Sequence, residues 1–236
     1  MRPLLLLLPL LGCQAEPFDS IHTRPDDNFA ASVQAVQSRM HLRFAAAQQT
    51  EQAIAASDLE RARTNAHVIS ELDEPEALAV WQPYIVDIRN AARQVESAGD
   101  VIAAAHTMGT LGMKCAQCHV AIKARVKFPE QPRPSDDPKL APQMLGHQWA
   151  AVQMWEGLIG PSNERWNAGA QALTAVPLNI VAQATTPAFA GDVDDVARIR
   201  LYARRAVKAT SDDARAAVFG DLLATCAHCH AILRDR

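Results

Sequence analysis

The pattern Cys-x-x-Cys-His occurs twice in this chain, as Cys115-Ala116-Gln117-Cys118-His119 and as Cys226-Ala227-His228-Cys229-His230. It is the attachment site of c-type haem, in which both thiols form thioethers with the porphyrin and the histidine binds the iron. On a helix the positions i, i+3 and i+4 share one face, so each motif can reach one porphyrin. The sequence therefore predicts two covalently bound c-type haems. The predicted haem-binding residues are Cys115, Cys118, Cys226 and Cys229 (covalent attachment) and His119 and His230 (proximal iron ligands).

Two other uses of paired cysteines remain as alternatives. A structural zinc site needs four ligands brought together, usually by a short loop, whereas Cys115 and Cys226 are 111 positions apart. A thioredoxin-like redox pair needs a βαβ context, and nothing around either motif has the pattern of a strand. Haem attachment is the preferred interpretation, because a histidine directly follows each pair and the motif is repeated.

The fifth cysteine, Cys13, ends an N-terminal segment in which Arg2 precedes a leucine-rich run and Leu-Leu-Gly-Cys. This arrangement resembles a bacterial lipoprotein signal, in which cleavage before the cysteine leaves it lipidated. The apolar stretch 3–11 has nine residues, against the roughly 20 that span a bilayer as a helix. We expect residues 1–12 to be a signal peptide and residues 13–26 a tether; a plain secretory signal and a short anchor are the alternatives.

Export agrees with haem attachment, because resemblance to bacterial c-type cytochromes implies attachment outside the inner membrane. We expect a lipid-anchored protein on the periplasmic side of a bacterial membrane. Gln14 stands where an inner-membrane retention signal would usually place aspartate, which favours the outer membrane. The net charge of −3 implies no nucleic-acid partner, and propionates would add negative charge, so we expect positively charged redox proteins as partners.

Five prolines lie within residues 126–143, a segment with little apolar content. That density forbids a regular helix or central strand and predicts an extended, semi-rigid linker. The linker separates two halves, residues 27–125 and 144–236, each ending with a haem motif. Without gaps, residues 44–51 align with residues 149–156, so the halves look like a duplication. The second half then has about six additional residues, which we expect around residues 177–191.

Both halves are predicted to be helical, because alanine is abundant, glycine is scarce and β-branched runs are lacking. The capping-box pattern Ser57-Asp58-Leu59-Glu60 would begin a helix, Asp73 before Glu74-Pro75 another, and Gly99-Asp100 would cap a third. We expect helices over about 28–56, 58–71, 75–97, 100–125, 140–159, 162–175, 192–209 and 212–234. The short connections predict an all-α fold of two tandem four-helix bundles, each with its haem on the last helix.

These features resemble cytochrome c′ and the related class II c-type cytochromes, here in tandem. The resemblance covers nearly all of residues 27–236, and its specific part is the haem motif on the last helix. It implies that a residue of the first helix faces the sixth position of the iron. A methionine there would give a six-coordinate electron carrier, and an apolar residue would leave the iron open to small gases.

The candidates for that distal position are Met40 in the first half and Met144 and His147 in the second. The two methionines become equivalent if one residue is inserted between them and the aligned pair Phe44 and Trp149. Trp149 would then lie on the helix that faces the haem. The alternatives are that both methionines fill the core, which is their usual role, and that His147 lies at the surface.

We expect a membrane-tethered dihaem cytochrome that carries single electrons between exported redox partners and is not an enzyme. Paired carboxylates such as Asp194-Asp195 are expected to solvate the chain or to favour a helix dipole, and no catalytic constellation emerges. The alternatives are a module that binds NO or CO at a five-coordinate iron, and a dihaem peroxidase, which would need acid/base groups beside an open haem.

Overall fold

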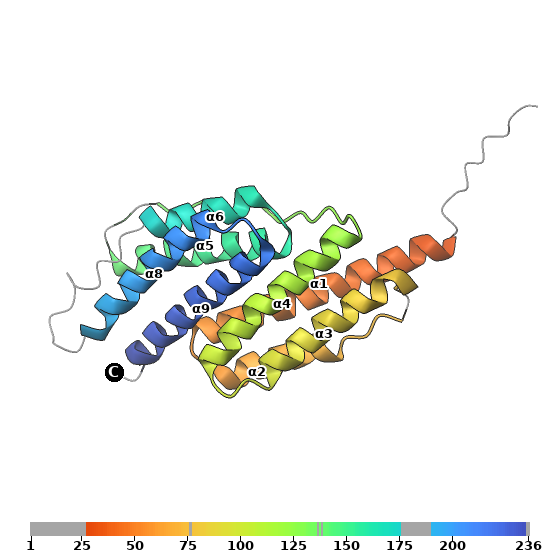
Figure 1. Cartoon of the computed structure of the whole chain (residues 1–236), viewed down its shortest axis with the longest axis horizontal. Coiled ribbons are helices and arrows are strands. Elements are labelled where there is room, and N and C mark those ends of the chain that lie inside the picture. Colours follow the sequence, from red (N-terminus) through yellow and green to blue (C-terminus); the bar gives the residue numbers. More distant parts are fainter. Residues whose placement is uncertain (1–26, 76, 136, 138, 176–189, 235–236) are drawn as a thin grey trace, which may run out of the picture.

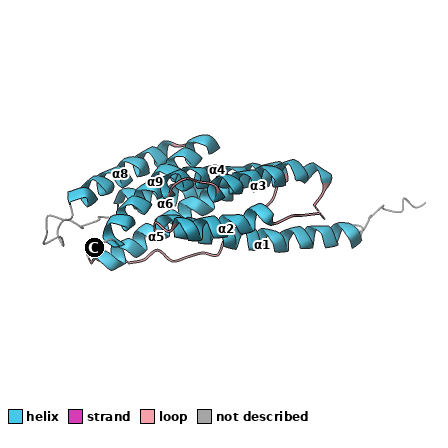
Figure 2. Cartoon of the chain, turned by 90° about the horizontal axis from the view of Figure 1, so that it is seen from below, coloured by secondary structure: helices cyan, strands magenta, loops and turns pink. Residues whose placement is uncertain are grey.

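The computed structural model describes residues 27–75, 77–135, 137, 139–175 and 190–234. The expected signal peptide 1–12, the tether 13–26 and Cys13 lie outside the described residues. Within the described ranges the chain is all-helical and has no strand, which confirms the all-α prediction (Figure 2). None of the described helices is both long and apolar enough to cross a membrane.

Eight α-helices and one short 3-10 helix make up the described structure. The first half contains α1 (Asp27–Ala55), α2 (Leu59–Glu71), η1 (Ala79–Trp81), α3 (Gln82–Glu96) and α4 (Val101–Ala121). The second half contains α5 (Leu140–Ile159), α6 (Asn163–Ala175), α8 (Ala190–Lys208) and α9 (Asp212–Arg234). The haem motifs lie near the ends of α4 and α9.

The second helix begins within one residue of its predicted start, but its cap is the residue after Ser57, and the predicted start of the third helix is wrong. The N-cap of α2 is Asp58, whose carboxylate accepts a hydrogen bond of 3.0 Å from the Arg61 amide, whereas Ser57 has a positive φ of 59°. The third helix begins at Gln82 instead of residue 75, because the Glu74 side chain turns inward to a buried arginine, described below. The predicted cap at Asp100 is confirmed, because its carboxylate accepts a hydrogen bond of 2.7 Å from the Ala103 amide at the start of α4.

The predicted start of the fifth helix, residue 140, is confirmed, so the last residues of the predicted linker 126–143 are helical. Helix α5 includes Pro142 in its first turn, where a missing amide hydrogen is tolerated. The remainder packs on the helices, since the ring of Phe128 lies 5.4 Å from that of Phe44. Nε1 of Trp149 donates a hydrogen bond of 2.9 Å to the Gln131 carbonyl oxygen, so the linker holds this tryptophan in place.

Successive helices pack on one another within each half, and the most extensive packing between described helices joins α4 to α9. These two helices lie side by side through the middle of the molecule (Figure 1). Two glycines permit the close approach: a Cβ at Gly109 would overlap the Ala216 carbonyl, and one at Gly220 would lie 2.9 Å from Cα of His106. One hydrophobic core therefore runs through both halves.

The first two helices of one half correspond to the first two of the other at a constant spacing in the sequence. Ala55 ends α1 and Ile159 ends α5, 104 positions later, and the N-caps Asp58 and Ser162 repeat at the same spacing. This register places Met40 and Met144 at equivalent positions without an insertion. It also corrects the expected pairing of Phe44 with Trp149 by one residue.

The spacing is 111 for the last helix, as the N-caps Asp100 and Ser211 show. The change from 104 to 111 between these caps means seven additional residues in the second half, where about six were expected. They fall between α6 and α8, and residues 176–189 of that connection lie outside the described structure.

Candidate haem-attachment sites

The three functional residues of the first motif face one cavity. Cys115, Cys118 and His119 all line a space of about 830 Å³, together with residues of α1, α3 and α5 and of the segment that follows α4. Pockets that bury a small molecule or cofactor typically measure about 300–1,000 Å³. The helical spacing of the motif has thus produced the shared face that haem attachment requires.

Met40 lies in the same cavity. Its side chain is partly buried against the cluster of Val36, Ala77 and Ile85, and the cavity that it lines is the one lined by His119. The structure therefore brings the first-half distal candidate and the first motif together across one space. His41 also lines this cavity but is exposed.

A buried ion pair that the sequence did not reveal lies on the wall of this cavity. Arg43 pairs with Glu74, and its other terminal nitrogen donates 2.9 Å to the Leu72 carbonyl. The side chains of Arg43 and Glu74 are 4% and 0% exposed, and both line the cavity. Among the described residues, Nε of Arg43 and one oxygen of Glu74 have no hydrogen-bond partner, which leaves polar atoms for a bound group.

The proximal histidine candidates are oriented by main-chain carbonyls. Nδ1 of His119 lies 2.7 Å from the Ile159 oxygen, and Nδ1 of His230 lies 2.6 Å from the Ala55 oxygen. A carbonyl can only accept, so each Nδ1 carries the hydrogen and each Nε2 keeps its lone pair. Burial also lowers the pKa of His119, opposed by the hydrogen bond to Ile159. Histidines that bind a metal usually donate their other ring nitrogen in this way.

The cysteines are not arranged for zinc. Burial raises the pKa of Cys115 and Cys226 to about 12 and that of Cys118 to about 11. Among the described residues, no three or more histidine, cysteine, aspartate or glutamate side chains converge where they could hold a metal ion. The four-ligand site required by the zinc alternative is not assembled in this part of the chain.

Each motif also meets a residue from the other half. Trp155 of α5 lines the cavity of the first motif. The equivalent position of α1, 104 residues earlier, is Glu51, whose negative charge raises the pKa of Cys226. Burial raises the pKa of Glu51 itself to about 7. The two sites therefore differ chemically, with an indole at one and a buried carboxyl at the other.

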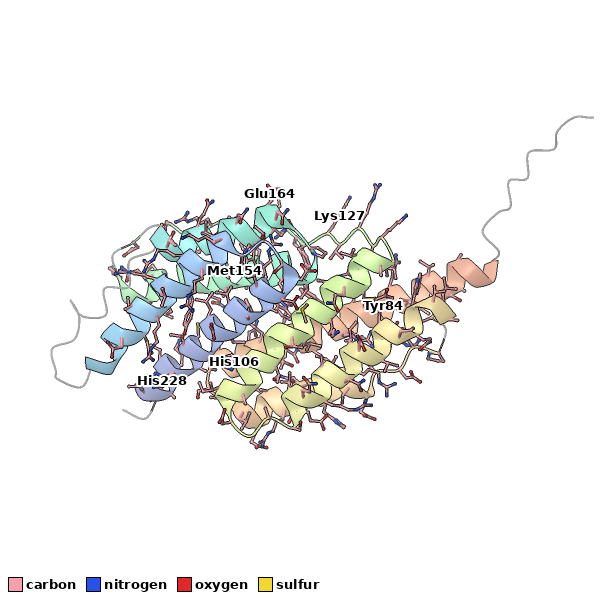
Figure 3. The ribbon with its side chains drawn as sticks, in the orientation of Figure 1. Tyr84, His106, Lys127, Met154, Glu164 and His228 are labelled. Carbon is pink, nitrogen blue, oxygen red and sulfur yellow. The ribbon has the colours of Figure 1, made fainter. Side chains whose placement is uncertain are left out.

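His228, inside the second motif, faces α8 instead of joining the ligand set. Its Nδ1 lies 2.7 Å from a carboxylate oxygen of Asp195, and Figure 3 shows it near the C-terminal end of α9. Asp195 is fully buried and pairs with Arg198 at 2.9 Å through its other oxygen. The expectation that Asp194-Asp195 only solvates the chain is therefore wrong for Asp195.

The second-half distal candidates differ in burial. His147 is 8% exposed, and its buried Nε2 has no hydrogen-bond partner in the part of the chain that the structure describes. Burial, reinforced by the positive charge of Arg200, lowers the pKa of His147 to about 4, so the ring is neutral at pH 7. Met144 is partly buried. The alternative of a surface position for His147 is wrong.

Comparison of the chain with protein-family models, with curated proteins and with solved structures found no match.

Proposed function

We propose that this protein is a dihaem c-type cytochrome, built as two fused four-helix bundles, that carries single electrons between exported redox partners. The observation that carries the proposal is the orientation of the two motif histidines. Each donates Nδ1–H to a backbone carbonyl, at 2.7 Å for His119 and 2.6 Å for His230. Each thus offers Nε2 to an iron, as metal-binding histidines do.

The residues of the first site fit a haem. Cys115 and Cys118 would attach it, His119 would bind its iron, and the surrounding cavity of about 830 Å³ is large enough for it. When bound, the haem iron supplies a reversible one-electron couple. The protein's own contribution is to hold the ligands, to exclude water with apolar walls such as Ile85 and Ile88, and to offer Arg43 to negative charge.

Met40 is the proposed sixth ligand of the first iron, because it lines the same cavity as His119. A thioether at this position closes the iron to small molecules and raises its reduction potential. Both effects suit an electron carrier better than a gas-binding module or a peroxidase.

The location of the protein is part of the proposal and rests on the sequence. Lipidation at Cys13 would confine the protein to the periplasmic side of a bacterial membrane, with the outer membrane favoured by Gln14. The net charge of −3 would favour positively charged redox partners.

Absorption spectra of the reduced holoprotein, before and after addition of carbon monoxide, test this function. The carrier requires low-spin bands that carbon monoxide leaves unchanged, and Met40→Leu should open one haem to the gas. Met113→Leu is the matched control, because Met113 lines a separate groove beside His106. A wild-type protein whose haems bind carbon monoxide would favour gas binding, and turnover of peroxide would favour the enzyme.

A further inference from the structure

We propose that His147 is the sixth ligand of the second haem, so that the two irons have unlike axial pairs: His119 with Met40, and His230 with His147. This inference rests on the proposed function, because it assumes that a haem is attached at Cys226 and Cys229. The sequence left two candidates for the distal ligand of the second haem, Met144 and His147, and this inference selects His147.

The first argument is the unsatisfied ring nitrogen of His147. Only 8% of the residue is exposed, and no described residue forms a hydrogen bond with the buried Nε2. Leaving a buried polar atom unpaired typically costs about 1–3 kcal/mol, and the large majority of buried side-chain polar atoms have a partner. An iron bound at Nε2 would supply the missing partner.

The second argument is the register between the halves. The 104-residue spacing of α1 and α5 makes His147 the counterpart of Arg43, which lines the first cavity beside Met40. His147 thus occupies the position that faces the haem-sized space in the first half. The opposite wall is also repeated, because Ile85 and Ile88 of α3 correspond to Val196 and Ile199 of α8 at the 111-residue spacing, and all four are buried.

The third argument separates His147 from Met144. A thioether sulfur is only a weak hydrogen-bond acceptor, so a methionine in this place loses little when no metal is bound. A buried imidazole nitrogen without a partner costs the folded protein more free energy than an unpaired thioether does. Its presence therefore indicates that a specific ligand pairs with it. The two equivalent residues also differ in chemistry. Arg43 in the first half is a cation neutralised by Glu74, whereas His147 in the second half has a side chain that can bind iron.

Unlike axial ligands have a consequence for the potentials. Methionine ligation raises the reduction potential of a haem, so the second site should have the lower potential of the two.

The test uses the full chain matured with its haems in a host that attaches c-type haem. Electron paramagnetic resonance of the ferric protein and a potentiometric titration are recorded for wild type, His147→Ala, His147→Met and the control Met144→Leu. In the wild type we expect one bis-imidazole and one methionine-ligated low-spin signal. His147→Ala should lose the bis-imidazole signal and bind carbon monoxide at one haem, His147→Met should raise the lower potential, and Met144→Leu should change neither.

A bis-imidazole signal that persists in His147→Ala, or a second-haem signal lost in Met144→Leu, would overturn the inference while leaving the dihaem function intact. Intact mass separates that failure from a failure of the function, because a protein without covalent haem would refute both. If His147→Ala does not fold, His147→Met decides, since it keeps a buried side chain and a possible ligand. An unchanged potential in folded His147→Met would then overturn the assignment.

Discussion

Nδ1 of His230 donates a hydrogen bond of 2.6 Å to the carbonyl oxygen of Ala55, the last residue of α1 in the other half of the chain. His119 makes the reciprocal contact, 2.7 Å from the carbonyl oxygen of Ile159 at the end of α5. Each proposed proximal ligand is therefore held by the half to which it does not belong. The two sites are built together, and neither half contains a complete one.

This exchange predicts that neither half is functional alone. A protein of residues 27–135 should be poorly soluble, because the face of α4 that packs on α9 would be exposed, and any haem that it binds should be heterogeneous because His119 lacks its carbonyl partner. Gel filtration and far-ultraviolet circular dichroism, with both halves co-expressed as the control, would measure this. A soluble single half with the haem spectrum of the full chain would contradict it.

Arg43 should be far more important for stability than an exposed arginine. Arg43→Met would leave the fully buried Glu74 carboxyl without its cation, and removing one partner of a buried pair typically costs about 3–5 kcal/mol. The control is Arg61→Met, at an exposed position, where a change within about 0.5 kcal/mol is typical. Urea unfolding of the holoprotein measures both. Equal effects of the two substitutions would show that the buried pair does not stabilise the fold.

Glu51 should give stability a pH dependence. Burial raises its pKa from 4.5 to about 7, so between these values the folded state binds a proton that the unfolded state has lost. The free energy of unfolding should therefore fall, by on the order of 3 kcal/mol, as pH rises through this window. Glu51→Gln should remove that slope, whereas Glu60→Gln, at an exposed position, should keep it.

His147 contributes the opposite slope and must be considered in that experiment. Its pKa is lowered to about 4, so the unfolded state binds the additional proton between pH 4 and 6.5, and its contribution to stability is lost as pH falls through that window. The effect of Glu51 is thus the difference between wild type and Glu51→Gln at each pH. A difference that does not vary with pH would contradict the assignment.

The glycine at the crossing of α4 and α9 should resist substitution. Alanine favours a helix over glycine by about 1 kcal/mol, but a Cβ at Gly109 would overlap the backbone carbonyl of Ala216, and overpacking typically costs about 1–3 kcal/mol. Gly109→Ala should therefore lower the melting temperature despite its better propensity. Gly99→Ala is the control, because its Cβ would meet nothing within 4 Å. A Gly109→Ala protein as stable as wild type would mean that the helices do not pack this closely.

The helical architecture was largely predictable, because it depends on local signals. Alanine-rich segments, the cap at Asp100 and the proline-rich break before α5 gave seven of the eight described α-helices to within about two residues at their N-termini. The start of α3 was missed because Glu74 forms an ion pair with Arg43, 31 positions away, and no local pattern encodes that partner.

The motif residues of the candidate sites were predictable, and their surroundings were not. Spacing alone placed Cys115, Cys118 and His119 on one face. The carbonyls of Ala55 and Ile159 carry no side-chain signal, and Trp155 reaches the site of the other half because α5 packs on α4 at Gly112, where a Cβ would lie 2.6 Å from the indole. The correct register could have been found from the capping residues Asp58 and Ser162, which repeat 104 positions apart.

Intact mass spectrometry of the purified protein, read with the cysteine variants, tests the central claim most directly. The wild type should carry the mass of two covalent haems, and replacing both cysteines of one motif by alanine, as Cys115→Ala with Cys118→Ala or Cys226→Ala with Cys229→Ala, should remove one haem each time. A wild-type protein with the mass of the bare polypeptide, or one that carries zinc at its cysteines, would contradict the account.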